Sequence, residues 1–212
     1  MSGLAQHRRI LVDLLGSGFS DKPEHFSYSI AAHADSLEAL INHLELNEFY
    51  IYGHSMGGAI SITLAARYRT RVKGLILSES NLDSGGGFFS QKIAAYHEQD
   101  YLNFGHDEII QASQAESNEN WAAALSISSP LAIYREARSL ITGQSPSWRQ
   151  LFYALTTSKS YLFGERSLPD PDFAALGAEN IRLDIVPDAG HSMAWENPEG
   201  LATAIKKAIS VI

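Results

Sequence analysis

The fold that this sequence predicts is decided by the stretch Phe49-Tyr50-Ile51-Tyr52-Gly53-His54-Ser55-Met56-Gly57-Gly58-Ala59-Ile60. An apolar run enters Gly53, a helix rich in small residues leaves Gly57, and Ser55 lies between them in the pattern G-x-S-x-G. This pattern predicts a tight turn from a strand into a helix, in which the residues two before and two after the serine must lack side chains. Such a turn exposes the serine hydroxyl and directs it at the positive end of the following helix.

The segments around this turn alternate between strand and helix patterns. A helix over residues 29–46, with Ser29 as its N-cap, precedes the turn, and Asn197 with Pro198 predicts the start of the last helix. We therefore expect an α/β fold with a mostly parallel, doubly wound sheet of about five strands. The predicted strands cover residues 10–15, 49–52, 72–78, 160–163 and, at the edge, 181–186.

The alternation stops at the glycine run Gly85-Gly86-Gly87, and no strand-like run follows before about Gly143. The intervening residues form polar and aromatic patches with helical spacing. We expect residues 85–144 to form a helical cap inserted into a core made of residues 1–84 and 145–212. Its aromatic side chains either pack the cap against the core or favour an apolar or aromatic substrate group.

Composition limits the class of protein. The 212 residues are 45% hydrophobic and 19% charged, which is typical of a soluble globular domain. The chain has no cysteine, which excludes disulfides and fits a cytoplasmic location. Its net charge of −8 argues against nucleic acid and anionic membranes as partners. We expect no metal, since no His or acidic cluster has a ligand spacing.

Three residues whose side chains could take part in catalysis follow the ends of predicted strands, namely Ser55, Glu79 and His191. In a parallel sheet, ligands gather at the carboxyl ends of the strands. A neutral serine is a poor nucleophile and needs a base within hydrogen-bond reach, and that base needs a carboxylate to orient it. The order serine, acid, histidine therefore predicts nucleophilic catalysis at this edge of the sheet.

Three motifs occur along this sequence, namely Asp13-Leu14-Leu15-Gly16-Ser17-Gly18-Phe19-Ser20-Asp21, Gly53-His54-Ser55-Met56-Gly57-Gly58 and Ala189-Gly190-His191-Ser192. They resemble the α/β-hydrolase superfamily and occur in the order of that family. By this resemblance Ser55 is the nucleophile, His191 is the general base, and the N–H of Met56 is one donor of the oxyanion hole. The resemblance implies no metal and no organic cofactor.

The acid of the triad departs from the usual pattern. Many members of the family carry an aspartate in a G-x-x-D loop after the penultimate strand, and Ser167 stands at that position here. Other members, including those that resemble haloalkane dehalogenases, take the acid from the end of the strand after the elbow helix, where Glu79 lies. We expect Glu79 to be the acid, with Asp170 as the alternative and Asp83 or Glu165 as further candidates.

A second departure concerns the start of the chain. Members of the family usually have strands before residues 10–15, and an HG-type loop after one of them gives the second oxyanion donor. The missing strand would lie between residues 10–15 and the elbow strand. We consider three explanations: the chain is a truncated product, or residues 10–15 move beside the elbow strand so that Gly16 or Ser17 donates, or a second copy covers the gap.

We therefore expect an enzyme, a carboxylesterase-like serine hydrolase that cleaves small carboxylic esters through an acyl-enzyme on Ser55. A serine at the elbow favours acyl transfer, since dehalogenases and epoxide hydrolases of this fold use an aspartate there. The alternative is a catalytically impaired α/β-hydrolase-like protein that binds a partner or dimerises, because its oxyanion hole lacks a donor. The expected partners are a small-molecule ester and, in addition, a second copy of the chain in a homodimer.

Overall fold

The computed structural model describes residues 4, 6–68 and 70–210, which form two compact units. The first unit holds the described residues of Met1–Ile10, Glu38–Leu82 and Trp148–Ile212, and the second holds Leu11–Leu37 and Asp83–Ser147. The second unit therefore includes the predicted insertion and also a segment that the sequence analysis assigned to the core. The interpretation of residues 85–144 as a cap stays a prediction.

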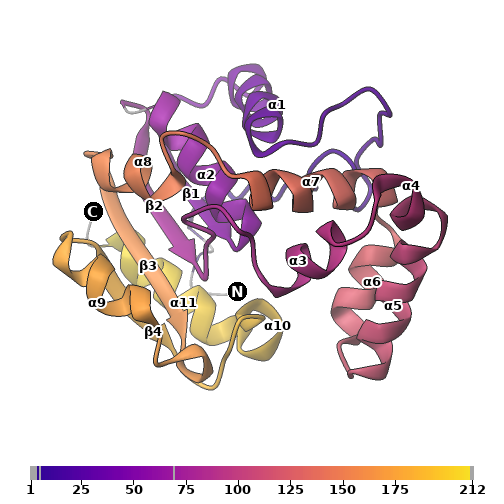
Figure 1. Cartoon of the computed structure of the whole chain (residues 1–212). Helices are drawn as coiled ribbons and strands as arrows, with labels where there is room; N and C mark the ends of the chain where they lie inside the picture. Colours follow the sequence, from indigo (N-terminus) through magenta and orange to yellow (C-terminus); the bar gives the residue numbers. More distant parts are fainter. Residues whose placement is uncertain (1–3, 5, 69, 211–212) are drawn as a thin grey trace. The chain divides into compact units, whose positions relative to one another are not determined.

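The first unit is built on a parallel sheet of four strands in the order β1-β2-β3-β4, as Figure 1 shows. All three strand pairs are parallel, which confirms the predicted α/β class and sheet type. Parallel neighbours in sequence order need a crossover between each pair, and the helices supply it. The strands are β1 (Phe49–His54), β2 (Val72–Ser78), β3 (Ser158–Gly164) and β4 (Arg182–Val186).

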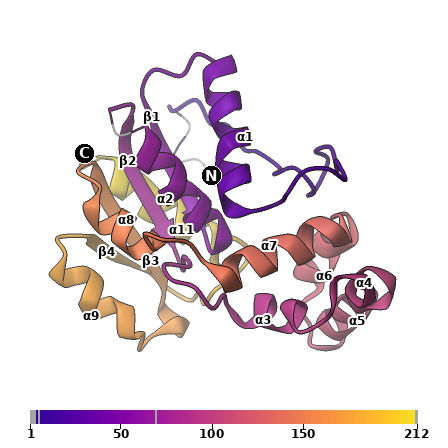
Figure 2. The same cartoon turned by 45° about the horizontal axis from the view of Figure 1, so that its top comes forward.

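Helices cover both faces of this sheet (Figures 1 and 2). Helices α2 (Met56–Arg67) and α8 (Trp148–Ala154) lie on one face, whereas α11 (Pro198–Ser210) packs on the other. The remaining elements of this unit are η3 (Glu165–Ser167), α9 (Pro171–Ala178) and the short α10 (Met193–Glu196). The sheet is thus doubly wound, as the sequence predicts.

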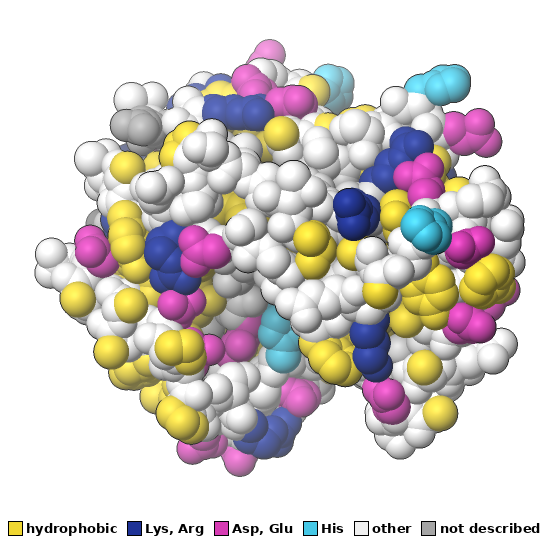
Figure 3. Space-filling model, in the orientation of Figure 1, with side chains coloured by type: hydrophobic (Ala, Val, Ile, Leu, Met, Phe, Trp, Pro, Cys, Tyr) yellow, Lys and Arg dark blue, Asp and Glu magenta, His cyan; other side chains and the backbone are white. Residues whose placement is uncertain are grey.

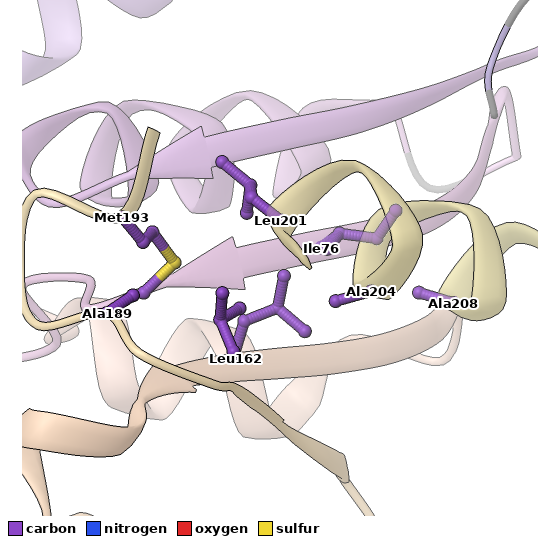
Figure 4. Close-up of a cluster of buried hydrophobic side chains, with 8 residues drawn as sticks. Ile76, Leu162, Ala189, Met193, Leu201, Ala204 and Ala208 are labelled. Atoms are coloured by element: carbon purple, nitrogen blue, oxygen red, sulfur yellow. The ribbon is translucent and has the colours of Figure 1, made fainter. Parts of the chain in front are cut away.

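The buried cluster under α11 explains how that helix is held (Figure 4). The strands contribute Ile76 and Leu162, and Leu201 of α11 packs against them. Small residues on the same helix face allow its backbone to approach the sheet closely. Pro198 opens the helix, and the Asn197 side chain accepts a hydrogen bond of 2.8 Å from the N–H of Gly200, which confirms the predicted cap.

The second unit is helical throughout its later part, and no strand occurs among its described residues. Helix α1 (Ile30–His43) begins in this unit, and the Ser29 hydroxyl accepts from the N–H of Ala32, as predicted for its cap. Buried side chains that include Ile93, Tyr101 and Leu125 form the hydrophobic core of this second unit. The other helices are α3 (Phe88–Ala94), α4 (Glu98–Asp100), η2 (Tyr101–Gly105), α5 (His106–Ala115), α6 (Glu119–Ser126) and α7 (Pro130–Thr142).

The predicted strand over residues 10–15 is wrong, and the sheet has four strands instead of about five. A strand needs the backbone groups of a neighbour, and β1 pairs only with β2 among the described residues. The segment forms instead the start of a turn, in which the Asp13 carboxylate accepts a hydrogen bond of 3.0 Å from the N–H of Phe19. The side chains of residues 10–12 are exposed, Leu11 to 83%, whereas those of Leu14 and Leu15 are partly buried.

The surface carries charges of both signs. Acidic, basic and apolar side chains are interspersed over the face that Figure 3 shows. In the described part of the chain, no helix combines the length and the apolar composition that crossing a bilayer requires.

Replacing Leu162 by Ala tests the core of the first unit. The side chain is fully buried between the sheet and α11, so its truncation leaves a cavity, and we expect a loss of about 2–5 kcal/mol in the free energy of unfolding. The exposed Leu11 provides a matched control, because Leu11→Ala removes the same atoms and is expected to change stability by less than about 0.5 kcal/mol. Urea unfolding followed by circular dichroism measures both, and equal losses would contradict this account of the core.

Candidate active site

Ser55 lies in a strained turn between β1 and α2. Its backbone has φ 50° and ψ −122°, a conformation that non-glycine residues rarely adopt. Hydrogen bonds hold it there: its N–H donates to the carbonyl of Ser78 at 3.0 Å, and its carbonyl accepts from the N–H of Gly58 at 2.9 Å. Strain of this kind persists only where the surrounding structure imposes it, and it is common at functional sites.

The glycines around Ser55 differ from the sequence prediction in one respect. A side chain at Gly53 would meet Ser61 Oγ at 2.4 Å, so this position does require glycine. Gly57, which the sequence pattern also marked as obligatory, has open space where its Cβ would lie, and that prediction is wrong. The close approach occurs instead at Gly58, where a Cβ would lie 2.1 Å from Ser80 Oγ.

Glu79 and His191 come together at the carboxyl ends of β2 and β4. Nδ1 of His191 lies 3.7 Å from Oε2 of Glu79, which is an ion-pair distance and longer than a hydrogen bond. The Glu79 side chain is 11% exposed, and the His191 side chain is 55% exposed. Like Ser55, Glu79 has a positive φ, of 44°. Two of the three residues that the sequence singled out are thus held in strained backbone positions.

The surroundings of Glu79 favour its charged form. Its Oε1 accepts a hydrogen bond of 2.8 Å from the N–H of Gly164. Burial by itself raises the pKa of the Glu79 carboxyl, but His191, the Gly164 N–H and the Ser167 hydroxyl together bring that pKa below its ordinary value. Ser167 stands where the resemblance implies an aspartate. Its hydroxyl contacts the carboxylate of Glu79, which lies at the end of the neighbouring strand β2.

The other candidate acids have structural partners of their own. Asp170 caps α9 and accepts a hydrogen bond of 2.7 Å from the N–H of Asp172. Glu165 accepts one of 2.9 Å from the N–H of Asp188, in the loop that leads to His191. Asp83 belongs to the second unit. Among the described residues, only the carboxylate of Glu79 lies within ion-pair distance of His191.

The loop that carries His191 is fastened by contacts that the sequence analysis missed. The N–H of Arg166 donates to the carbonyl of Ala189 at 2.8 Å, and the N–H of Gly190 donates to Oε2 of Glu196 at 2.6 Å. The Arg166 guanidinium pairs with Glu196 at 3.0 Å. The loop is therefore held at both of the residues that precede the imidazole.

Met56 is the first residue of α2, so its N–H has no acceptor within the helix. No acceptor for it, and no hydrogen bond of Ser55 Oγ, occurs in the part of the chain that the structure describes. Gly16 and Ser17, offered above as replacement donors, use their N–H groups inside their own turn, to Asp21 at 2.8 Å and to Leu14 at 2.9 Å. Residues 10–15 also form no strand beside β1, so the explanation in which they pair with the elbow strand is wrong.

His54 is a functional candidate that the sequence analysis passed over. Its ring lies 4.7 Å from the ring of His191, centroid to centroid, and its Nδ1 lies 3.0 Å from Ser78 Oγ. Ser78 is fully buried and also lies 2.7 Å from the hydroxyl of Tyr52. The signal that could have found it is its position inside the motif, next to Ser55. No group of three or more His, Cys, Asp or Glu residues able to hold a metal ion occurs in the described residues.

Comparisons with known proteins show the family of this chain. Residues 1–198 match the alpha/beta hydrolase fold family. A segment of 78 residues is 35% identical to the 2-hydroxy-6-oxo-2,4-heptadienoate hydrolase of Pseudomonas putida and covers 36% of this chain and 28% of that protein. A segment of 84 residues is 38% identical to the proline iminopeptidase of Chitinophaga pinensis and covers 38% and 27%. The matched segments thus span little more than a quarter of these relatives.

Solved structures match over more of the chain. A thermophilic esterase from Thermogutta terrifontis superposes with a TM-score of 0.74 at 25% identity, over 93% of this chain and 78% of that one. An esterase from Exiguobacterium antarcticum superposes with a TM-score of 0.73 at 20% identity, over 93% and 80%. The second likeness shows the fold alone.

Alanine at Gly58 and at Gly57 tests the steric account of the turn. Gly58→Ala drives a methyl group into Ser80, and we expect it to lower the free energy of unfolding by about 1–3 kcal/mol. Gly57→Ala, one residue away in the first turn of the same helix, meets open space and makes the unfolded chain less flexible, so stability should be unchanged or rise by up to about 1 kcal/mol. Urea unfolding of the two variants measures the difference, and a larger loss at Gly57 would reverse the assignment.

The pH dependence of stability tests the environment of Glu79. Because its pKa in the folded protein lies below the ordinary value of 4.5, its charge contributes stability that is complete above that value and is lost as the pH falls through the folded pKa. We expect the difference in unfolding free energy between the unmodified protein and Glu79→Gln to be largest near neutral pH and to shrink below pH 4.5. Urea titrations at a series of pH values measure it; a difference that grows on acidification would show that the folded pKa is raised.

Proposed function

Because the chain belongs to the alpha/beta hydrolase fold family, we propose that it is a serine hydrolase that cleaves small carboxylic esters through an acyl-enzyme on Ser55. The observation that carries the proposal is the contact of His191 Nδ1 with Glu79 Oε2 at the same strand ends as the strained turn of Ser55. The likeness to an esterase from Thermogutta terrifontis supports the ester as substrate class.

In the proposed mechanism, Ser55 Oγ attacks the acyl carbon while Nε2 of His191 takes the hydroxyl proton. Nδ1 of the same ring faces Glu79, whose negative charge stabilises the imidazolium that forms. The imidazolium then protonates the leaving alcohol as the ester bond breaks. A water molecule gives its proton to Nε2 and attacks the acyl carbon, and the imidazolium returns this proton to Ser55 Oγ as the bond to the acyl group breaks and the acid leaves.

The N–H of Met56 is the proposed donor to the oxyanion. Its place at the first position of α2 leaves it without an intrahelical partner, and the helix dipole favours negative charge there. The proposal assigns no second donor, because the N–H groups of Gly16 and Ser17 are already used. Loss of one donor typically costs about 10²–10³ in turnover, so we expect a slow esterase.

We also propose that residues 85–144 act as a cap domain and that the protein works in the cytoplasm, which its lack of cysteine supports. Asp170 stays the alternative acid. The acidic net charge supports a small-molecule partner over nucleic acid.

A second candidate function rests on the outer edge of β1. Among the described strands β1 is paired on one side only, and Tyr50 and Tyr52 are more than one third exposed. An open strand edge favours pairing with another chain. The competing proposal is therefore a catalytically impaired protein that dimerises or binds a partner through this edge.

Hydrolysis of p-nitrophenyl acetate by matched variants separates these proposals. We expect Ser55→Ala and His191→Gln to abolish turnover, and Glu79→Gln to lower kcat by about 10²-fold or more, since the imidazolium loses its counter-charge. Asp170→Asn is the control for the acid, because asparagine caps helices as well as aspartate does, and kcat should change less than about twofold.

Two results would contradict the proposal. Equal rates for the unmodified protein and Ser55→Ala would remove the esterase and leave the binding function, which sedimentation analysis of the oligomeric state then tests. Full activity of Glu79→Gln together with an inactive Asp170→Asn would move the acid to Asp170.

A further inference from the structure

The contact between Glu79 and His191 does not by itself fix the imidazole. At 3.7 Å the pair lacks the directional hydrogen bond that orients a catalytic histidine, and more than half of the His191 side chain is exposed. The ring can therefore turn about its side-chain torsions unless a second contact limits it. The ring of His54, at a centroid distance of 4.7 Å and an interplanar angle of 48°, is the aromatic contact of His191 among the described residues.

The imidazole of His54 is itself held by a contact with Ser78. Its Nδ1 lies 3.0 Å from Ser78 Oγ, and that hydroxyl lies 2.7 Å from the hydroxyl of Tyr52. These three side chains come from two paired strands, since His54 stands opposite Ser78 in the register of β1 and β2. Because Ser78 is fully buried, its hydroxyl must use these partners, and the orientation of the His54 ring follows from them.

His54 is neutral under the conditions in which the proposed reaction runs. Burial, together with the neighbouring His191, lowers the pKa of His54 to about 4. A neutral ring presents an uncharged aromatic surface to His191 in both protonation states of the latter, so the contact persists while the general base gains and loses its proton.

We propose that His54 is a positioning residue for His191: the ring of His54, anchored through Ser78 to Tyr52, limits the rotation of the His191 imidazole that the contact with Glu79 leaves free. The inference rests on the proposed function, in which His191 is the general base. It assigns no contact between His54 and the substrate.

Three substitutions of His54 separate its ring from its hydrogen bond. Alanine removes both, phenylalanine keeps the ring, and asparagine keeps a polar atom near the place of Nδ1 without the ring. We expect His54→Ala and His54→Asn to lower kcat for p-nitrophenyl acetate about tenfold with KM changed less than about twofold, because the base is misplaced and the substrate is not. His54→Phe should stay within about threefold of the unmodified protein.

Ser78→Ala tests the anchor. If Ser78 acts through His54, its removal should lower kcat about threefold, and the double variant with His54→Ala should be no slower than His54→Ala alone. Additive losses would show that Ser78 acts independently of His54 and would overturn this part of the proposal. A loss of kcat that follows the melting temperature of the variants, irrespective of whether the ring is kept, would show a merely structural role.

A measurement without turnover separates this inference from the proposed function. We expect ¹³C relaxation at Cε1 of His191, assigned with His191→Gln, to show a rigid ring in the unmodified protein and in His54→Phe and a more mobile ring in His54→Ala. Equal order in all three proteins would overturn the positioning role. Failure of a fluorophosphonate to label Ser55 in the unmodified protein would overturn the esterase, whereas a ring that His54 still restrains would uphold the contact.

Discussion

The close approach of α2 to the ends of β1 and β2 is the constraint on which the site depends. Gly53 and Gly58 leave space only for hydrogen atoms, so the chain turns sharply between them and Ser55 is held at a positive φ. The carbonyl of Ser78 then fixes the N–H of Ser55. The backbone that presents the serine is therefore determined by packing between neighbouring elements, and the strain is balanced by the buried contacts around it.

Contacts from the neighbouring strand end hold Glu79 in its charged form. Glu79 lies at the end of β2, and the hydroxyl of Ser167, which follows β3, contributes to lowering the pKa of the Glu79 carboxyl. The N–H of Gly164, the last residue of β3, donates a hydrogen bond to the same carboxylate. The end of β3 thus holds the charged side chain that follows β2. Glu79 is thus a largely buried charge with several hydrogen-bond donors around it, which is the condition under which such a charge is tolerated.

Local patterns in the sequence predicted the turn at Ser55, the caps at Ser29 and Asn197, and the parallel sheet, because each depends on residues close together in the chain. The strand over residues 10–15 was predicted wrongly because an apolar run becomes a strand only beside a partner, and no local pattern contains that partner. The obligatory glycine was misplaced by one residue because the obstacle, Ser80, is more than twenty positions away. The contact of His54 with His191 depends on the register of β1 and on a loop distant in sequence, so the motif alone could not reveal it.

The position of β1 at the end of the strand order affects how easily the turn at Ser55 is disturbed by local unfolding. Within the described residues a single ladder, to β2, holds the strand that carries Ser55, whereas β2 and β3 are each held by two. Opening a terminal strand breaks fewer contacts than unfolding the sheet, so it happens more often and at lower temperature. This local opening displaces Ser55 from its turn. Heating would therefore disorder the turn at Ser55 while most of the sheet is still folded.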